Sequence, residues 1–155
     1  MYLLKVFQLI VEETSKTPEI NLNQRTGEFI LSGKSIPENA AKVYEPVLNW
    51  VSDYIQHARP TTNFRINLEY FNTASSIWIT KIVKELLKIK EPDYVLIMHL
   101  YVPLEDYDEM KEFDDLKEAF APVTDILQGA TLSTGIKLYG LDDDGKILKD
   151  TLIFF

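Results

Sequence analysis

The chain of 155 residues contains no cysteine and only six glycines, and its acidic residues outnumber its basic residues by 24 to 16. The absence of cysteine excludes disulfide bonds, thiolate catalysis and thiolate metal sites. The few glycines are scattered, so none of the glycine-rich patterns that hold a phosphate or a dinucleotide is present. The formal net charge of −8 repels nucleic acid and anionic membranes, and no local basic patch offsets it. We therefore expect neither as a partner.

Long hydrophobic runs are also missing. The opening sequence MYLLKVFQLIVEET is apolar but too short to cross a bilayer, and it lacks the basic start and cleavage site of a signal peptide. A cytoplasmic protein is the resulting expectation. The hydrophobic fraction of 46% and the charged fraction of 26% are ordinary for a globular protein. We expect residues 1–155 to form a single domain with a core of its own.

The residue types that carry catalysis or bind metals form no recognisable constellation. His57 and His99 lie on different predicted elements and make no zinc-binding pattern. The acidic turn LDDDGK has part of a calcium-loop pattern, but Gly140 and Thr151 stand where its first and last carboxylate ligands belong. We predict no metal site, no cofactor and no catalytic residue. The alternative is a small ligand-binding or enzymatic α/β domain with a pocket at the carboxyl ends of its strands.

Hydrophobic periodicity predicts strands that alternate with helices. Strands are expected over 3–13, 28–32, 64–71 and 93–102, helices over 40–55, 73–90 and part of 105–120, and a hairpin with an Asp144-Gly145 turn over 136–155. The segment 93–102 is apolar on both faces, as expected of a strand buried inside a sheet. This order favours an α/β domain in which helices pack on a central mixed sheet and the hairpin extends its edge.

Both long helices have capping residues near their predicted starts. Ser35 and Glu38 have the spacing of a capping box before the first helix, and Pro37 suits its first turn. Before the second helix, Asn72 or Thr73 is the predicted N-cap. These residues predict where the strands end and the helices begin.

The segment Asn72–Ser76 places three hydroxyl residues between a strand and a helix. One of these hydroxyls can act only as a helix cap, which is the commoner role, or it can accept a phosphate. The free N–H groups and the helix dipole stabilise a phosphate there by roughly 0.3–1 kcal/mol per charge. The phosphate would also change the surface by about −1.5 to −2 charges. Spacing by itself favours the cap, and the chemistry permits the phosphate without showing that it is added.

Four ordered blocks of sequence resemble the SiaC family of bacterial regulatory phosphoproteins, which is similar in fold to the STAS domains of anti-sigma factor antagonists. The blocks are TPEI at 17–20, SGKSIPENA at 32–40, YEPVLNWVSDYI at 44–55 and LEYFNTASSIWI at 68–79. The resemblance is strongest over residues 17–100, and the hairpin within 130–155 is the most divergent part.

The resemblance implies a STAS-like fold and a non-enzymatic switch. Members of the family are phosphorylated on the threonine of an Asn-Thr-Ser-Ser-like motif by a kinase and dephosphorylated by a PP2C-like phosphatase. In the best-known system the unmodified form activates a diguanylate cyclase, which links the switch to cyclic di-GMP and biofilm formation. The matching phosphoacceptor is Thr73, with Ser75 and Ser76 as fallback acceptors, and Ala74 stands where many relatives have serine.

The loop before the first helix is a second candidate region. This loop contains Pro37, Glu38 and Asn39, which can serve only to start the helix. Alternatively, they form a partner surface together with Asn72, because strand-to-helix loops of one sheet often lie at the same end of the sheet. An adaptor that binds constitutively and is never modified is a third possibility. The sequence does not identify the kinase, the phosphatase, the output partner or the active phosphorylation state. It also leaves the oligomeric state open, since the terminal TLIFF strand can pair with a second copy.

Overall fold

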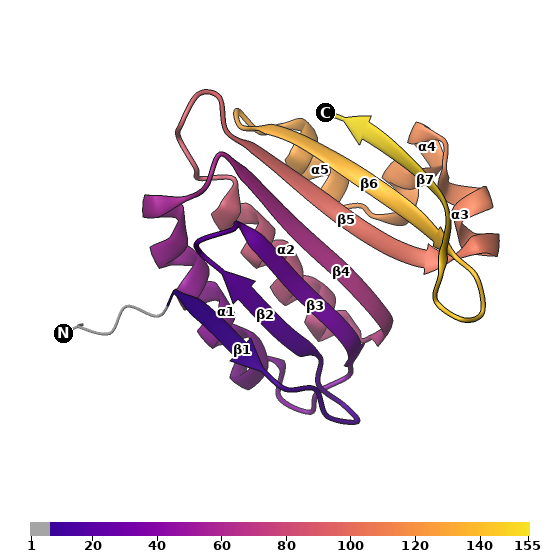
Figure 1. Cartoon of the computed structure of the whole chain (residues 1–155), viewed down its shortest axis with the longest axis horizontal. Helices are drawn as coiled ribbons and strands as arrows, with labels where there is room; N and C mark the ends of the chain where they lie inside the picture. The colour runs from indigo at the N-terminus through magenta and orange to yellow at the C-terminus, as the bar shows by residue number, and fades with distance from the viewer. Residues whose placement is uncertain (1–6) are drawn as a thin grey trace.

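The computed structural model describes residues 7–155, which form one seven-stranded sheet with the strands side by side in chain order (Figure 1). The strands are β1 (Gln8–Val11), β2 (Glu19–Asn23), β3 (Glu28–Ser35), β4 (Thr61–Phe71), β5 (Val95–Pro103), β6 (Ser133–Leu141) and β7 (Ile147–Phe154). The sheet is mixed, because β3 to β6 run parallel to one another while the pairs β1–β2, β2–β3 and β6–β7 are antiparallel.

The helices connect the parallel strands. They are α1 (Ala40–Tyr54) with the 3-10 turn η1 (Ile55–His57), α2 (Thr73–Leu86), α3 (Leu104–Met110), α4 (Phe113–Ala119) and α5 (Val123–Gln128). Each connection advances by one strand in the same direction, so right-handed crossovers place the helices on the same face of the sheet. Figure 1 shows them behind the sheet, with α1 and α2 packed side by side.

The core lies between the sheet and these helices. Alternate residues of β2 and β3, such as Leu22 and Phe29, point toward α1 and are buried. The ring of Phe29 meets Trp50 and Tyr54 edge-on, with centroid distances of 5.3 and 4.8 Å. Such aromatic pairs contribute about 0.5–1.5 kcal/mol each beyond their buried area. This packing holds α1 over β3 and so positions the loop that joins them.

The other face of the sheet carries a polar and aromatic cluster. Arg65 Nη1 donates to Tyr101 Oη at 2.9 Å, and Arg65 Nε pairs with Glu28 Oε1 at 2.7 Å. His99 Nδ1 lies 3.3 Å from Arg65 Nη1. These contacts link β3, β4 and β5 on the face that the helices do not cover.

The histidine in this cluster is neutral and structural. Burial, together with the nearby positive charge of Arg65, lowers the pKa of His99 to about 4. The hydroxyl of Tyr139 lies 2.7 Å from His99 Nδ1 and Asn63 Oδ1 lies 2.7 Å from Nε2, so the ring carries its proton on Nε2 and donates it to Asn63. His57, by contrast, is exposed at the end of η1. The two histidines therefore form no shared site.

The predicted architecture is confirmed. The α/β class, the mixed sheet, the two long helices and the hairpin at the sheet edge are all present. Two elements were not predicted, the short strand β2 and the helix α5. Part of the predicted first strand falls on residues 1–6, outside the described residues, and residues 8–11 form β1. β5 is an interior strand, but only one of its faces is covered by helices, which differs from the expectation of a strand buried on both faces.

Candidate functional site

The turn between β4 and α2 exposes Thr73 at the first position of the helix. Of the two predicted N-caps, Asn72 and Thr73, the structure shows Asn72. Its Oδ1 accepts a hydrogen bond from the backbone N–H of Ser75 at 2.9 Å. The N–H groups of Thr73 and Ala74 belong to the first turn and so have no acceptor inside the helix. Within the described part of the chain, no residue hydrogen-bonds to the Thr73 hydroxyl, which leaves it open to solvent.

The two fallback hydroxyls lie in different environments. Ser75 is fully buried, and its Oγ lies 2.7 Å from Asn72 Oδ1 and 3.0 Å from the carbonyl oxygen of Ser35. Ser76 is half-buried, and its carbonyl oxygen accepts from Thr80 Oγ1 at 2.9 Å. Of the three predicted acceptors, only Thr73 therefore presents its hydroxyl at an exposed position.

A buried chain of hydroxyls lies beneath this turn. Ser35 Oγ hydrogen-bonds to Tyr44 Oη and lies 2.7 Å from Ser75 Oγ, and all three residues are fully buried. Burial raises the pKa of Tyr44, so its hydroxyl stays protonated. Ser75 gives its single proton to Asn72 or to the Ser35 carbonyl, so Ser35 must donate to Ser75 and Tyr44 must donate to Ser35. The chain runs in one direction from α1 to the cap of α2.

The end of β3 is shaped to bring Ser35 to this position. The register between β3 and β4 shifts after Gly33, where φ is 108°: Gly33 pairs with Leu68 and Lys34 with Tyr70, so β4 bulges at Glu69 and Ser35 comes to lie beside Phe71. A side chain at Gly33 would also put its Cβ 2.6 Å from Glu13 Oε2. The predicted capping box is therefore wrong: Ser35 is a buried strand residue, and the α1 cap is Asn39, whose Oδ1 accepts from Lys42 N at 3.3 Å.

The loop between β3 and α1 lies directly beside the Thr73 turn. Asn72 Nδ2 donates to the carbonyl oxygen of Pro37 at 3.3 Å, and Asn72 N donates to Ser35 O at 2.9 Å. Glu38 is exposed and pairs with Lys16 Nζ at 3.2 Å. The four residues suggested as a partner surface, Pro37, Glu38, Asn39 and Asn72, thus lie on two adjoining turns, where Glu38 and Asn39 are exposed, Asn72 is half-buried and Pro37 is buried.

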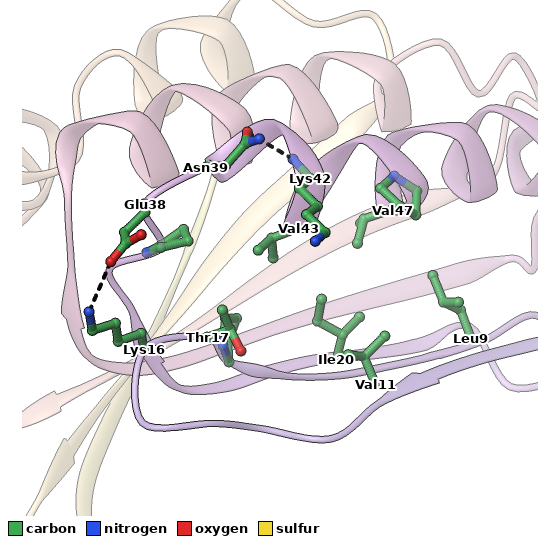
Figure 2. Close-up of a pocket in the computed structure, with 13 residues that line it drawn as sticks. Leu9, Val11, Lys16, Thr17, Ile20, Glu38, Asn39, Lys42, Val43 and Val47 are labelled. Carbon is green, nitrogen blue, oxygen red and sulfur yellow. Dashed lines mark hydrogen bonds and ion pairs between the residues drawn. The ribbon is translucent and has the colours of Figure 1, made fainter.

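An open groove of about 520 Å³ runs from this loop between α1 and the first two strands (Figure 2). Its floor is apolar, with Val11 and Ile20 facing Val43, while Lys16 and Glu38 stand at its end. The TPEI and SIPENA segments of the sequence, distant along the chain, both line it. The groove and the Thr73 turn share the loop Ile36–Asn39.

A second hollow of about 880 Å³ lies at the carboxyl ends of β4 and β5, where the alternative prediction places a ligand pocket. Its described lining includes Glu69, Glu105, Asp142 and Asp143, and none of the lining residues is basic. Carboxylates repel the phosphates of a nucleotide. Residues 7–155 contain no cluster of three metal-ligating side chains, and none of their helices is long and apolar enough to cross a membrane.

The sequence contains signals for the buried residues that the sequence analysis missed. Ser35 continues the alternation of Phe29 and Leu31, so a period of two places it on the covered face of the sheet. Ser75 precedes Ile79 by four residues and therefore shares its buried helix face. Neither pattern identifies Tyr44 as their partner, because that contact forms only when α1 packs on β3.

The fold and this turn define an α/β domain with an exposed threonine at an asparagine-capped helix start. The chain belongs to the SiaC family of regulatory phosphoproteins, whose model matches residues 11–127. The expected family is confirmed, and with it the expectation of a regulatory protein that is not an enzyme.

Solved structures of similar fold come from Pseudomonas aeruginosa. Apo-SiaC has a TM-score of 0.65 at 20% identity, covering 84% of this chain and 98% of that one. A second structure is described as diguanylate cyclase SiaD in complex with its activator SiaC. The matched chain has a TM-score of 0.64 at 19% identity, and the match covers 84% of this chain and 99% of that one. At such identities the likeness shows a shared fold.

A sequence relative is an uncharacterised protein of Pseudomonas aeruginosa strain UCBPP-PA14. It is 28% identical over 67 residues, which are 43% of this chain and 53% of the relative. The match therefore spans about half the length of that protein.

Proposed function

We propose that this protein is a switch in which reversible phosphorylation of Thr73 controls binding to a protein partner. The observation that carries the proposal is the exposed Thr73 hydroxyl at the start of α2, beside N–H groups without helical acceptors. A phosphate there is stabilised by roughly 0.3–1 kcal/mol per charge. The turn can therefore accept the modification without loss of the fold.

The same proposal favours Thr73 over its neighbours. A kinase must place the acceptor hydroxyl against ATP, and the buried Ser75 hydroxyl is already engaged with Asn72 and Ser35. Modification of Ser75 would require the helix start to open. Ser76 is half-buried against the sheet and remains the second choice.

Partner binding would use the two adjoining turns. Asn72 directly precedes Thr73 and is hydrogen-bonded to the loop that carries the exposed Glu38 and Asn39, so an addition of about −1.5 to −2 charges at Thr73 changes the surface that a partner would meet. SiaC, the relative of similar fold, is described as the activator of diguanylate cyclase SiaD. By analogy we propose a diguanylate cyclase as the output partner, a role in cyclic di-GMP and biofilm signalling, and a cognate kinase and a PP2C-like phosphatase as the modifying enzymes. A cytoplasmic location stays a prediction.

The direct test is intact-mass spectrometry of the protein purified from its native host. We expect a species heavier by one phosphate, with fragmentation that localises the group to Thr73. The variant Thr73→Ala should lose all labelling by the cognate kinase and keep its melting temperature, since Asn72 rather than Thr73 caps the helix. Undiminished labelling of this variant would remove Thr73 as the acceptor. Saturable binding and turnover of a nucleotide would instead favour the alternative of a ligand pocket.

A further inference from the structure

The sheet splits at the carboxyl ends of its two central strands. Pairing between β4 and β5 ends at Ile66 and Leu100. Beyond these residues β4 stays beside β3, and β5 stays beside β6, so the two strands diverge (Figure 1). We call the facing segments Asn67–Phe71 and Tyr101–Pro103 the sheet split. Each segment has a strand partner on one side only, and the hollow of about 880 Å³ lies between them.

The two faces of the sheet split differ in chemistry. The larger hollow extends from the face without helices to Leu104 and Glu105 at the start of α3, and its lining includes carboxylates, among them Glu69, and no basic residue. On the helix face, a smaller pocket of about 80 Å³ is lined mainly by apolar side chains, including Leu68, Leu100 and Ile79. Tyr101, which contacts Arg65 on the face without helices, lines the larger hollow, and Ile79 of α2 lines the smaller pocket, while Leu68 lines both.

Large apolar side chains are exposed beside the sheet split. Tyr70, Phe71 and Ile77 have exposed fractions of 64%, 54% and 53%. They lie at the end of β4 and in the first turns of α2, on either side of Thr73. Tyr70 lines the larger hollow and Phe71 the smaller pocket, and large exposed apolar side chains beside a free strand edge favour a protein as the occupant. The candidate occupant is therefore a protein segment.

We propose that the sheet split is a docking site for an extended segment of a partner protein in which basic and apolar residues alternate. Free strand edges bind extended segments through backbone hydrogen bonds. Side chains of such a segment point alternately to the two faces of the sheet. One set would meet the carboxylates and the other the apolar pocket, so the alternation follows from the difference between the faces.

The inference rests on the protein-binding role proposed above but does not require phosphorylation. Its test uses the unmodified full chain and two fluorescein-labelled peptides. The first, Lys-Val-Lys-Leu-Lys-Val-Lys, has the proposed alternation, and the second replaces valine and leucine by serine. In the NMR spectrum of isotopically labelled protein, we expect the first peptide to change the chemical shifts of backbone amides. The changes should cluster at Asn67–Phe71 and Tyr101–Pro103. The serine peptide should bind about fivefold more weakly or worse.

Charge reversal supplies the matched control. Glu69→Lys combined with Asp143→Lys should weaken binding of the first peptide by about tenfold or more. Asp142 is left intact, because its carboxylate accepts from the N–H groups of Asp144 and Lys146 and holds the turn. Glu91→Lys with Asp93→Lys makes the same change of net charge at the exposed opposite end of β5, and should alter affinity by less than about twofold.

Each contrary outcome overturns the inference. Equal weakening in both double variants would mean that the peptide responds only to the net charge of −8. Amide shifts away from the sheet split, or equal binding of the serine peptide, would reject the site or the alternation. Thr73→Ala should bind the first peptide like the unaltered protein, so loss of the phosphoacceptor and loss of docking are separate results.

Discussion

Two turns at one end of this sheet have the same local design and different surroundings. Asn39 caps α1 and Asn72 caps α2, with oxygen-to-nitrogen distances of 3.3 and 2.9 Å. Around Asn39 the neighbouring contact is the exposed ion pair of Glu38 with Lys16. Around Asn72 the same side chain also meets the buried hydroxyl of Ser75 and the carbonyl of Pro37.

This difference shows how an exposed residue can be held in a defined position. Thr73 itself is exposed, yet the residue before it and the second residue after it are attached to the core through Ser35 and Tyr44. A buried polar network stabilises a unique arrangement only when its members are all satisfied. No buried side-chain nitrogen or oxygen of the described residues lacks a partner. The Asn72 turn is therefore tied to the core by buried hydrogen bonds, and the contacts described for the Asn39 turn include none of this kind.

The strongest test of this comparison exchanges the two caps for alanine. Asn72→Ala should lower the free energy of unfolding by about 2–3 kcal/mol, because a cap is lost and the Ser75 hydroxyl loses a buried partner. Asn39→Ala should cost about 1 kcal/mol, the usual value for a cap alone. Urea denaturation followed by circular dichroism measures both, and Asn67→Ala at an exposed strand position is the control. Equal losses would contradict the assignment of different roles.

A smaller effect is expected at the far end of the hydroxyl chain. Tyr44→Phe keeps the buried ring and removes the donor to Ser35, which should cost about 1–2 kcal/mol. Tyr70→Phe is the matched control, because Tyr70 is 64% exposed, and a change within about 0.5 kcal/mol is expected there. Thermal unfolding of the two variants side by side gives the comparison. A Tyr44 variant as stable as the control would show that the chain does not hold the turn.

The smallest effect is expected at the Asn39 turn. Glu38→Gln breaks the ion pair with Lys16. The side chain of Glu38 is 87% exposed and that of Lys16 is 58% exposed. Exposed pairs contribute about 0–1 kcal/mol, and we expect less than about 0.5 kcal/mol here, reduced further by salt. Urea denaturation at low and high ionic strength measures it. A loss above about 1 kcal/mol would mean that this turn, too, is anchored to the rest of the fold.

The features predicted from sequence are those that depend on neighbours along the chain. The helix α2 follows from its apolar spacing, and its cap was narrowed to Asn72 or Thr73, since a cap involves residues three positions apart. The strand β2 is not predicted, because only Ile20 and Leu22 mark its alternation. Short segments carry too few repeats of a pattern to identify the element.

The buried partners of the candidate site could not be predicted in this way. Ser35 and Ser75 are separated by 40 residues, and their contact depends on β3 and β4 pairing in the shifted register that begins at Lys34. A one-residue change of register would turn Ser35 to the opposite face. The capping-box pattern at Ser35 and Glu38 was misleading for the same reason, because strand pairing extends β3 through Ser35.

The sequence by itself determined the class of fold, the alternation of strands and helices, and a threonine at the start of a helix, because these follow from periodicity and local hydrogen bonding. Only the tertiary structure decided that Ser35 links Tyr44 to Ser75, that the two turns adjoin, and that β4 and β5 separate beyond Ile66 and Leu100. Those properties arise from contacts between segments distant along the chain, and their free energy is gained only when the sheet and its helices pack together.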